Sequence, residues 1–460
     1  MRLFSMYSWN RERHVLSAYS YKFLGAPWAG GVVLLVCVAI AMLLANLPLT
    51  AEIYHNLLHT NLSLNISYGD HNFVFPKEMT LEKAINDGLM VIFFFTVGLE
   101  IKREILFGQL SSPKKAILPV VAALGGMLAP ALIFSIFNIG TPAQNGWGIP
   151  TATDIAFAVG ILSMLGRRVP ISLKVFLTAL AIADDLGAII VIALFYSSDI
   201  HVSYIILSAL CVMAMVIANT LKVRAKSFYV CVGLVLWYTM LNSGIHATIA
   251  GVITAFCVPA SLKKGTGHYL ERIRENVGKF PVIDIDDRHN TIVLTHDQIH
   301  TLKSIESAAD KMISPLQDLE DNLHGLINFF IIPLFAFANA GIDMSQMSFG
   351  SLFSGVGLAV MLGLVLGKFL GVFSFSWLAI KLNIVKLPAH TTWKAFASVC
   401  VVCGIGFTVS MFIADLSYAG LGADGAALLA QAKLGVLVGS VVSALLGCFL
   451  LGRTLPKELK

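Results

Sequence analysis

Blocks of about 20 consecutive apolar residues recur along this chain, and a helix of that length crosses the hydrocarbon core of a bilayer. The blocks constrain the fold more than any other feature of the 460 residues. Charged residues make up only 13% of the chain, whereas a soluble domain carries roughly 25%. The pattern predicts an all-α polytopic membrane protein with about twelve transmembrane helices. It excludes an ordinary soluble domain.

Lys and Arg residues gather in alternate linkers between the apolar blocks. Because cytoplasmic loops of membrane proteins are enriched in Lys and Arg, the alternation predicts an even number of spans with both termini cytoplasmic. Lys77 and Lys83, on either side of the start of the second span, depart from it. The basic residues of the alternate linkers include Lys102, Arg103, Lys114, Lys115, Arg167, Arg168, Lys222, Arg224, Lys226, Lys381, Lys386 and Arg453.

Two linkers are long enough to have structure of their own. Residues 50–80 contain SLNISYGDHNFVF, where apolar and polar residues alternate around a Gly-Asp pair, and this predicts a small external β-hairpin. Residues 261–318 are polar and charged, which predicts a long cytoplasmic loop, partly helical near its end. We expect the chain 1–460 to form a single transmembrane domain that carries both loops. The first apolar segment begins only near Ala26, which indicates a retained helix rather than a cleaved signal peptide.

The stretch ALAIADDLGAII places two carboxylates, Asp184 and Asp185, inside an apolar block. Each costs on the order of 3 kcal/mol at the centre of a spanning helix. Successive residues on a helix point about 100 degrees apart, so both cannot face one partner. A helix-end cap or a buried ion pair is the structural alternative, but the pair lies in the middle of its block. We therefore interpret the two acids as a site for a cation or for protons.

A third acid lies in the preceding block, GWGIPTATDIAFAVG, which contains Pro150, Thr153 and Asp154. A helix broken at the proline frees carbonyl groups, which is tolerated at mid-depth only where the backbone lines a cavity or packs in protein. Carbonyl and carboxylate oxygens are hard ligands, which alkali cations prefer. The alternative is a proline kink with a capping aspartate.

A lone lysine, Lys368, lies in the block MLGLVLGKFLGVF. A lysine in such surroundings is paired or neutral, and Asp184 or Asp185 is its obvious partner. A snorkelling lysine near a helix end is the alternative. The spacing of Cys400 and Cys403 is metal-like or redox-like, but no second pair or histidine cluster accompanies it, so we interpret both as small buried hydrophobes.

The strings FFFTVGLEIKRE, TATDIAFAVG, ALAIADDLGAI, LNSGIHATIAG, PLFAFANAGI and GIGFTVSMF together resemble the bacterial NhaA-type sodium/proton antiporters, in order and over nearly the whole chain. The resemblance implies inverted repeats and two broken helices, the fourth and the eleventh, that cross near the membrane midplane. Interrupted spans mark the central site of transporters, a generalisation drawn in part from this same family and therefore not independent support. The resemblance also implies the inner membrane and a homodimer joined through the hairpin.

Residue roles follow from the same resemblance. Asp184 and Asp185 are implied to bind the cation and the protons, and Lys368 to pair with Asp184. The implied supports of the crossing are Thr153, Asp154, Gly404 and Gly406. The implied groups of the pH response are Glu100, Arg103 and Glu104 in GLEIKRE, Glu320 and His324 in LEDNLHG, and His246.

One of these roles has an alternative, and one segment departs from the family pattern. A hydrogen-bonded interfacial histidine is an equally good interpretation of His246. The segment FPVIDIDDRHNTIVLTHDQ, between the eighth and ninth spans, is longer than the connection expected in the family.

The predicted function is export of Na+ or Li+ in exchange for H+, electrogenic and regulated by pH, with no cofactor and no enzymatic activity. An acid pair cannot hold a bare cation and protons at once, because protonation removes the charge that binds the ion. An intramembrane aspartic protease would have a Gly-x-Gly-Asp string, which is absent from the sequence. A passive channel would need a repeated filter lining. The remaining alternative is a transporter of the same fold with another specificity, K+/H+ exchange or Na+-coupled transport of an organic anion.

Overall fold

The computed structural model describes residues 28–62, 64–68, 71–75, 79–196, 201–261, 266–279, 295–342, 344, 355–418 and 421–455. The predicted cytoplasmic termini and residues 262–265 and 280–294 of the predicted long loop lie outside these residues. The chain divides into two compact units. Unit 1 comprises Met1–Phe93, Glu104–Ser198 and Gly325–Lys460, and unit 2 comprises Phe94–Arg103 and Asp199–His324.

The described part of the chain contains nine helical segments that are long and apolar enough to span a membrane, or ten if one bent pair counts as a span. The chain is therefore a multi-pass membrane protein. Two further apolar helices, Lys226–Leu241 and Ile249–Cys257, are shorter than such a span. The prediction of about twelve spans stays a prediction. The nine segments are Ala29–Asn46, Leu81–Phe107, Pro113–Asn138, Pro142–Met164, Ile171–Phe195, Val202–Thr220, Pro315–Ala340, Gly355–Lys381 and Asp424–Thr454.

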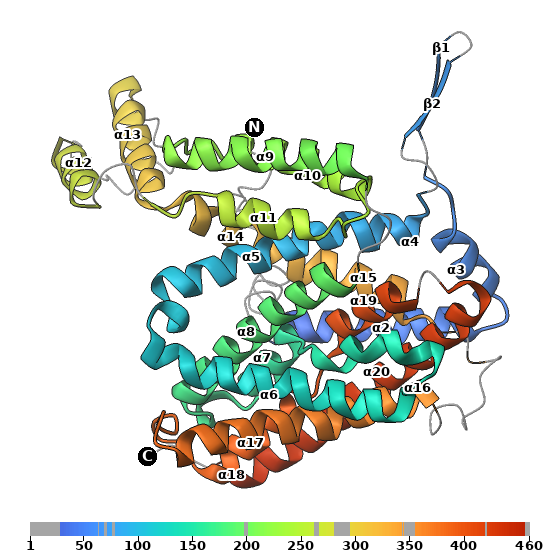
Figure 1. The fold of residues 1–460 in the computed structure, drawn as a ribbon. Coiled ribbons are helices and arrows are strands. Elements are labelled where there is room, and N and C mark those ends of the chain that lie inside the picture. Colours follow the sequence, from blue (N-terminus) through green and yellow to red (C-terminus); the bar gives the residue numbers. More distant parts are fainter. Residues whose placement is uncertain are drawn as a thin grey trace, which may run out of the picture. The chain divides into compact units, whose positions relative to one another are not determined.

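Unit 1 holds most of the spans (Figure 1). Its core packs the long helix α6 against α8, α16 and α17, and α20 against α16, α18 and α19. Its helices are α2 (Ala29–Asn46), α3 (Ala51–Leu58), α4 (Leu81–Lys83), η1 (Ala84–Leu89), η2 (Gln109–Ser111), α6 (Pro113–Asn138), η3 (Pro142–Thr151), α7 (Ile155–Met164), η4 (Gly166–Arg168), α8 (Ile171–Phe195), η5 (Ile327–Ile331), α15 (Ile332–Ala340), α16 (Gly355–Leu362), η7 (Gly363–Gly367), α17 (Lys368–Lys381), α18 (Trp393–Val402), α19 (Phe407–Tyr418) and α20 (Gly422–Thr454).

Unit 2 is built around a helical cluster in which α9, α10 and α11 pack on one another. Residues 94–103 of α5 (Met90–Phe107) belong to this unit, and the rest of α5 belongs to unit 1. A polar helix pair, α12 and α13, packs together within the region predicted as the long loop. The other helices of unit 2 are α9 (Val202–Thr220), α10 (Lys226–Leu241), α11 (Ile249–Cys257), α12 (Thr266–Lys279), α13 (His296–Met312) and α14 (Pro315–Leu326), whose last two residues fall in unit 1.

A two-stranded antiparallel hairpin forms where alternating residues predicted one. Strand β1 (Leu64–Tyr68) pairs with β2 (His71–Phe75) in a register that sets Leu64 opposite Phe75 and Tyr68 opposite His71. The two strands form a separate ribbon in Figure 1. The location of the hairpin outside the membrane stays a prediction.

The closest helix contact that positions the site is between α6 and α17. Gly125 of α6 and Gly371 of α17 meet backbone to backbone, and a Cβ added at Gly371 would lie 2.6 Å from the Gly125 carbonyl carbon. Small residues allow helices to approach closely within a bilayer, where apolar side chains gain little by leaving lipid. Next to this contact, the side chain of Lys368 passes over Gly126.

This contact yields a stability prediction. Gly371→Ala is expected to destabilise the protein by about 1–3 kcal/mol, because the added methyl group overpacks the α6–α17 contact. The measurement is the melting temperature of the purified protein in detergent. Gly452→Ala in α20 is the matched control, since no atom lies within 4 Å of its added Cβ. Equal melting temperatures for the two variants would contradict the packing argument.

Candidate functional site

Two helix breaks in unit 1 meet and satisfy each other's backbone groups. The first break comprises residues 152–154 between η3 and α7, and the second comprises residues 403–406 between α18 and α19, which are bent by 43°. The amide of Asp154 donates to the carbonyl of Ile405 at 2.7 Å. The hydroxyl of Thr153 donates to the carbonyl of Cys403 at 3.0 Å. A broken helix is tolerated in an apolar setting only when its freed polar groups find such partners.

Asp154 caps two half-helices at once. Its Oδ1 accepts from the amide of Phe157, which caps the start of α7, at 3.2 Å. Its Oδ2 accepts from the amide of Thr408, in the first turn of α19, at 3.2 Å and from the Thr408 hydroxyl at 2.7 Å. A carboxylate is favourable at the positive end of a helix dipole, and here it serves two such ends. The sequence analysis gave a capping aspartate as the alternative interpretation of Asp154. The structure shows this cap on α7 and a second one on α19.

Gly406 allows the two breaks to come together, and Gly404 allows the second break to pack on η7 and α20. A Cβ on Gly406 would lie 3.0 Å from the Ala152 carbonyl oxygen, and a Cβ on Gly404 would lie 2.5 Å from the Ser443 hydroxyl of α20. A larger residue at position 406 would push the two crossing segments apart, and one at position 404 would clash with Leu364 and Ser443. The glycines therefore belong to the structure of the crossing rather than to its chemistry.

The carboxylate of Asp184 on α8 forms an ion pair through its Oδ2 with Lys368 at the start of α17, and both side chains are fully buried. The apolar setting of Lys368 left Asp184 and Asp185 open as partners, the resemblance implied Asp184, and the observed ion pair is with Asp184. The other oxygen, Asp184 Oδ1, is buried and accepts no hydrogen bond from any residue that the structure describes. Thr153 lies beside Asp184, which joins the acid to the crossing.

Asp185 is also buried, with 4% of its surface exposed. No group of three or more His, Cys, Asp or Glu residues suited to a metal ion occurs in the described ranges. Cys400 and Cys403 are free and buried, as the small-hydrophobe interpretation predicts.

The residues of the predicted pH response fall into several places. Arg103 of α5 pairs with Glu320 of α14 at 2.7 Å, within unit 2. Glu100 of α5 and His324 of α14 belong to the same unit, and His246 lies in the turn between α10 and α11. Glu104 belongs to unit 1, where it accepts a hydrogen bond from the amide of Gln109 at 2.7 Å. Two of the predicted pH-response residues, Arg103 and Glu320, thus form an ion pair with each other.

Several hydroxyl groups near the crossing were not singled out from the sequence. Thr408 binds Asp154, and Ser440 of α20 accepts from the amide of Phe407 at 3.3 Å. The hydroxyls of Ser410 and Ser443 are buried and, among the residues that the structure describes, have no hydrogen-bond partner. Ser440 and Ser443 are three residues apart and so share one face of α20. Small polar residues at this spacing within an apolar block were the signal that could have revealed them.

Comparison with known proteins points to one family. Residues 21–451 match the family model described as Na+/H+ antiporter 1. The chain is 49% identical over 432 residues to the Na+/H+ antiporter NhaA of Phocaeicola vulgatus, which covers 93% of this chain and 94% of that protein. It is 48% identical over 431 residues to NhaA of Bacteroides thetaiotaomicron, covering 93% and 95% of the two chains. It is 44% identical over 437 residues to NhaA of Shewanella loihica, covering 95% and 97%.

Removing the hydroxyl at position 408 tests the double cap. Thr408→Val is expected to cost about 1–3 kcal/mol, because a buried oxygen of Asp154 loses its shorter hydrogen bond. Thermal unfolding in detergent measures the loss. Thr408→Ser keeps the hydroxyl and is the matched control, so a serine variant as unstable as the valine variant would contradict the cap.

Removing the buried lysine tests the ion pair. Lys368→Met leaves the buried carboxylate of Asp184 without its cation and is expected to cost about 3–5 kcal/mol. Lys381→Met, at the exposed end of the same helix where the ammonium lies over Trp377, serves as the control. Equal melting temperatures of the two variants would show that the Asp184–Lys368 pair does not stabilise the folded protein.

Proposed function

Because the chain belongs to the Na+/H+ antiporter 1 family, we propose that it exports sodium or lithium ions from the cytoplasm in exchange for protons. The observation that carries the proposal is the acid pair on α8: Asp184 holds Lys368 through one oxygen while its buried second oxygen accepts no hydrogen bond from the described residues. An anionic oxygen left open in an apolar interior is costly unless a proton or a metal ion occupies it during the cycle.

The proposed exchange is a competition for Asp184 and Asp185. In one state a bare cation lies on the carboxylate oxygens, supported by the hydroxyl of Thr153. In the other state a proton occupies Asp185, and the protonated ammonium of Lys368 neutralises the Asp184 carboxylate. The two states exclude each other because a protonated acid no longer attracts the cation, and two coupled acids titrate together rather than singly. Release of protons on one side and of the cation on the other gives antiport.

The crossing supports this exchange by positioning. Asp154 is saturated with hydrogen bonds from both half-helices. We therefore assign it a structural part, that of holding α7 and α19 at the crossing beside Asp184. The partial positive charge of the two half-helix N-termini is thereby neutralised by Asp154 rather than directed at the cargo. A transport cycle that moves the crossing would move all these groups together.

The finer features of the proposal rest on the family and on the charge pattern. Exchange is electrogenic, with more than one proton per cation, and the protein is a homodimer of the bacterial inner membrane with both termini cytoplasmic. Twelve spans form inverted repeats around the crossing near the midplane. The Arg103–Glu320 pair supports a pH response in which Glu100, Glu104, His246 and His324 also take part.

A different cargo is the alternative, either K+/H+ exchange or Na+-coupled transport of an organic anion. The oxygen ligands at Asp184 and Asp185 suit any alkali cation. The relatives' printed names, Na+/H+ antiporter NhaA, favour sodium. Which ion collapses an imposed pH gradient in everted vesicles decides between these cargoes.

The acid pair gives a test of the exchange. Asp184→Asn with Asp185→Asn is expected to abolish exchange, because neutral amides neither bind the cation strongly nor take up protons. The measurement is dequenching of a pH-sensitive dye in everted vesicles on addition of Na+, Li+ or K+ in turn. Asp424→Asn, an exposed acid in the first turn of α20, is the control and should retain exchange. Full exchange in the double variant would overturn the proposal.

The charged pair of unit 2 gives a test of the pH response. Glu320→Gln removes the charge that pairs with Arg103 and is expected to shift the pH at which exchange is half-maximal while preserving the maximal rate. Glu271→Gln, an exposed acid on α12, should leave the pH profile unchanged. The profile is measured in everted vesicles at saturating Na+. Identical profiles for both variants would remove this pair from the pH response.

A further inference from the structure

Unit 1 contains a second buried lysine–aspartate pair, away from the acids of α8. Lys433 of α20 lies with its Nζ 2.8 Å from Asp415 Oδ1 of α19, and the two side chains are only 9% and 15% exposed. The same ammonium donates to Asn339 Oδ1 of α15 at 3.2 Å. A buried ion pair is costly to assemble and strongly destabilising to break, so its position in a fold calls for an explanation.

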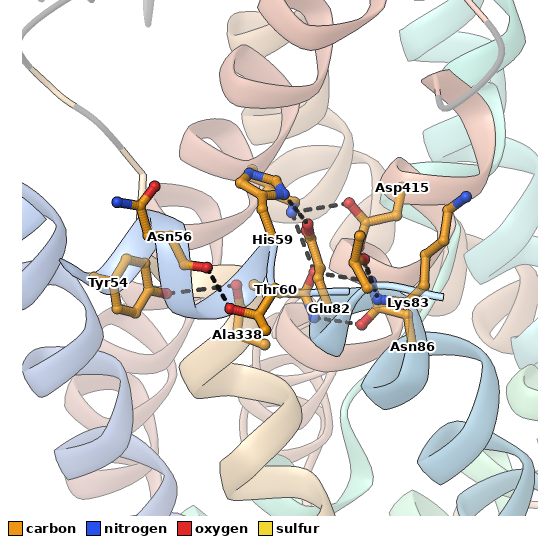
Figure 2. Close-up of polar contacts among 12 residues, drawn as sticks. Tyr54, Asn56, His59, Thr60, Glu82, Lys83, Asn86, Ala338 and Asp415 are labelled. Atoms are coloured by element: carbon orange, nitrogen blue, oxygen red, sulfur yellow. Dashed lines mark hydrogen bonds and ion pairs between the residues drawn. The ribbon is translucent and has the colours of Figure 1, made fainter. Parts of the chain in front are cut away.

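Two asparagines close this pair into a ring. Asn86 of η1 donates to Asp415 Oδ2 at 3.2 Å and to Asn339 Oδ1 at 3.3 Å. Asn339 donates back to Asn86 Oδ1 at 2.8 Å. Figure 2 shows Asn86 and Asp415 facing one another across this network. We call Asn86, Asn339, Asp415 and Lys433 the polar ring.

The polar ring joins four helical elements at corresponding ends. Asn86 lies near the start of the span Leu81–Phe107, and Asn339 near the end of the span Pro315–Ala340. Asp415 lies in the last turn of α19, and Lys433 is the twelfth of the 33 residues of α20. The linkers that follow α15 and α19, residues 341–354 and 419–421, contain no Lys or Arg. By the positive-inside rule these ends face outward, with Lys77 and Lys83 the exceptions near the first of them.

Helix α19 connects the polar ring to the crossing. Thr408 at its beginning holds Asp154, and Asp415, seven residues later, holds Lys433 and accepts from Asn86. Seven residues are about two helical turns, so the two anchors lie on the same face of one rigid rod. Two of the joined spans also contain a π-helical turn, η1 and η5, and such turns occur frequently at functional sites.

We propose that Asn86, Asn339, Asp415 and Lys433 are positioning residues for transport, which hold the outward ends of four spans together and keep α19 in place while the site is closed to the outside. The ring opens when the site opens outward. This inference rests on the proposed function, since it assigns the ring to one step of that cycle. Its chemistry is an internal cation, the Lys433 ammonium, held by oxygens that come from two different helices, α15 and α19.

If the polar ring stabilises the outward-closed state, it affects transport differently from a contact that only stabilises the fold. A protein divided between two conformations binds a ligand with an affinity reduced by the fraction in the competent state. Breaking a contact present only in the outward-closed state raises the outward-open fraction. The KM for Na+ presented from outside should then fall, and the KM for Na+ presented from inside should rise. Loss of a contact that only stabilises the fold lowers the amount of active protein and leaves both KM values unchanged.

The experiment measures both KM values for three variants that break the polar ring at different points, Asp415→Asn, Lys433→Met and Asn86→Ala. Right-side-out and everted vesicles, normalised for protein amount, give Na+ exchange from each side. We expect the two KM values to move in opposite directions, each by about fivefold or more. Asp424→Asn, an exposed acid near the same end of α20, is the matched control and should change neither value.

The outcomes separate the two levels of the proposal. KM values that shift in opposite directions, in the variants that are produced, support the proposal that the polar ring stabilises the outward-closed state. Unchanged KM values, or shifts in the same direction on both sides, overturn this proposal and leave the polar ring with a role in the stability of the fold alone. Absence of Na+-dependent exchange in the unaltered protein overturns the proposed function itself, whatever the variants do.

Discussion

The buried ion pair between Asp184 and Lys368 is the interaction on which the centre of the structure depends. A carboxylate alone in an apolar interior costs several kcal/mol, and the lysine offsets that cost only by lying directly against it. The lysine reaches this place because α17 packs closely on α6, where its stem crosses Gly126. Glycines on both helices are therefore as necessary to the pair as the two charges. The pair in turn leaves one buried Asp184 oxygen without a hydrogen bond from the described residues.

The crossing follows the same rule with backbone groups in place of side chains. Two helices are interrupted, and each interruption supplies what the other lacks: the Ile405 carbonyl accepts from Asp154, and the Cys403 carbonyl accepts from Thr153. Asp154 then neutralises two half-helix ends that would otherwise face each other with like partial charge. A break in one helix alone would leave buried groups unsatisfied, so the two breaks are stable only as a pair.

The polar ring extends this logic to the far end of α19. It is closed by amides as well as by charges, so Asp415 and Lys433 are each hydrogen-bonded beyond their own pair. Helix α19 is thus held by polar contacts near both ends, at Thr408 by Asp154 and at Asp415 by Lys433 and Asn86. Packed helices with such contacts move as discrete units rather than bending, which is what a two-state transport cycle requires.

The sequence by itself determined that the chain spans a membrane, that the helix around Pro150 is interrupted, and that Asp154, Asp184, Asp185 and Lys368 needed explaining, because the cost of a charge or a proline in an apolar block is a local property. The second broken helix was implied by the resemblance. Two of the apolar blocks of the sequence form the short helices α10 and α11, and the count of about twelve spans stays a prediction. The resemblance, and not the local pattern, indicated that Lys368 pairs with Asp184, and only the tertiary structure revealed that Asp154 caps two helices. It alone revealed the polar ring, whose members lie up to 347 residues apart. Partners are chosen by where packing brings distant helices together, and no local pattern records that.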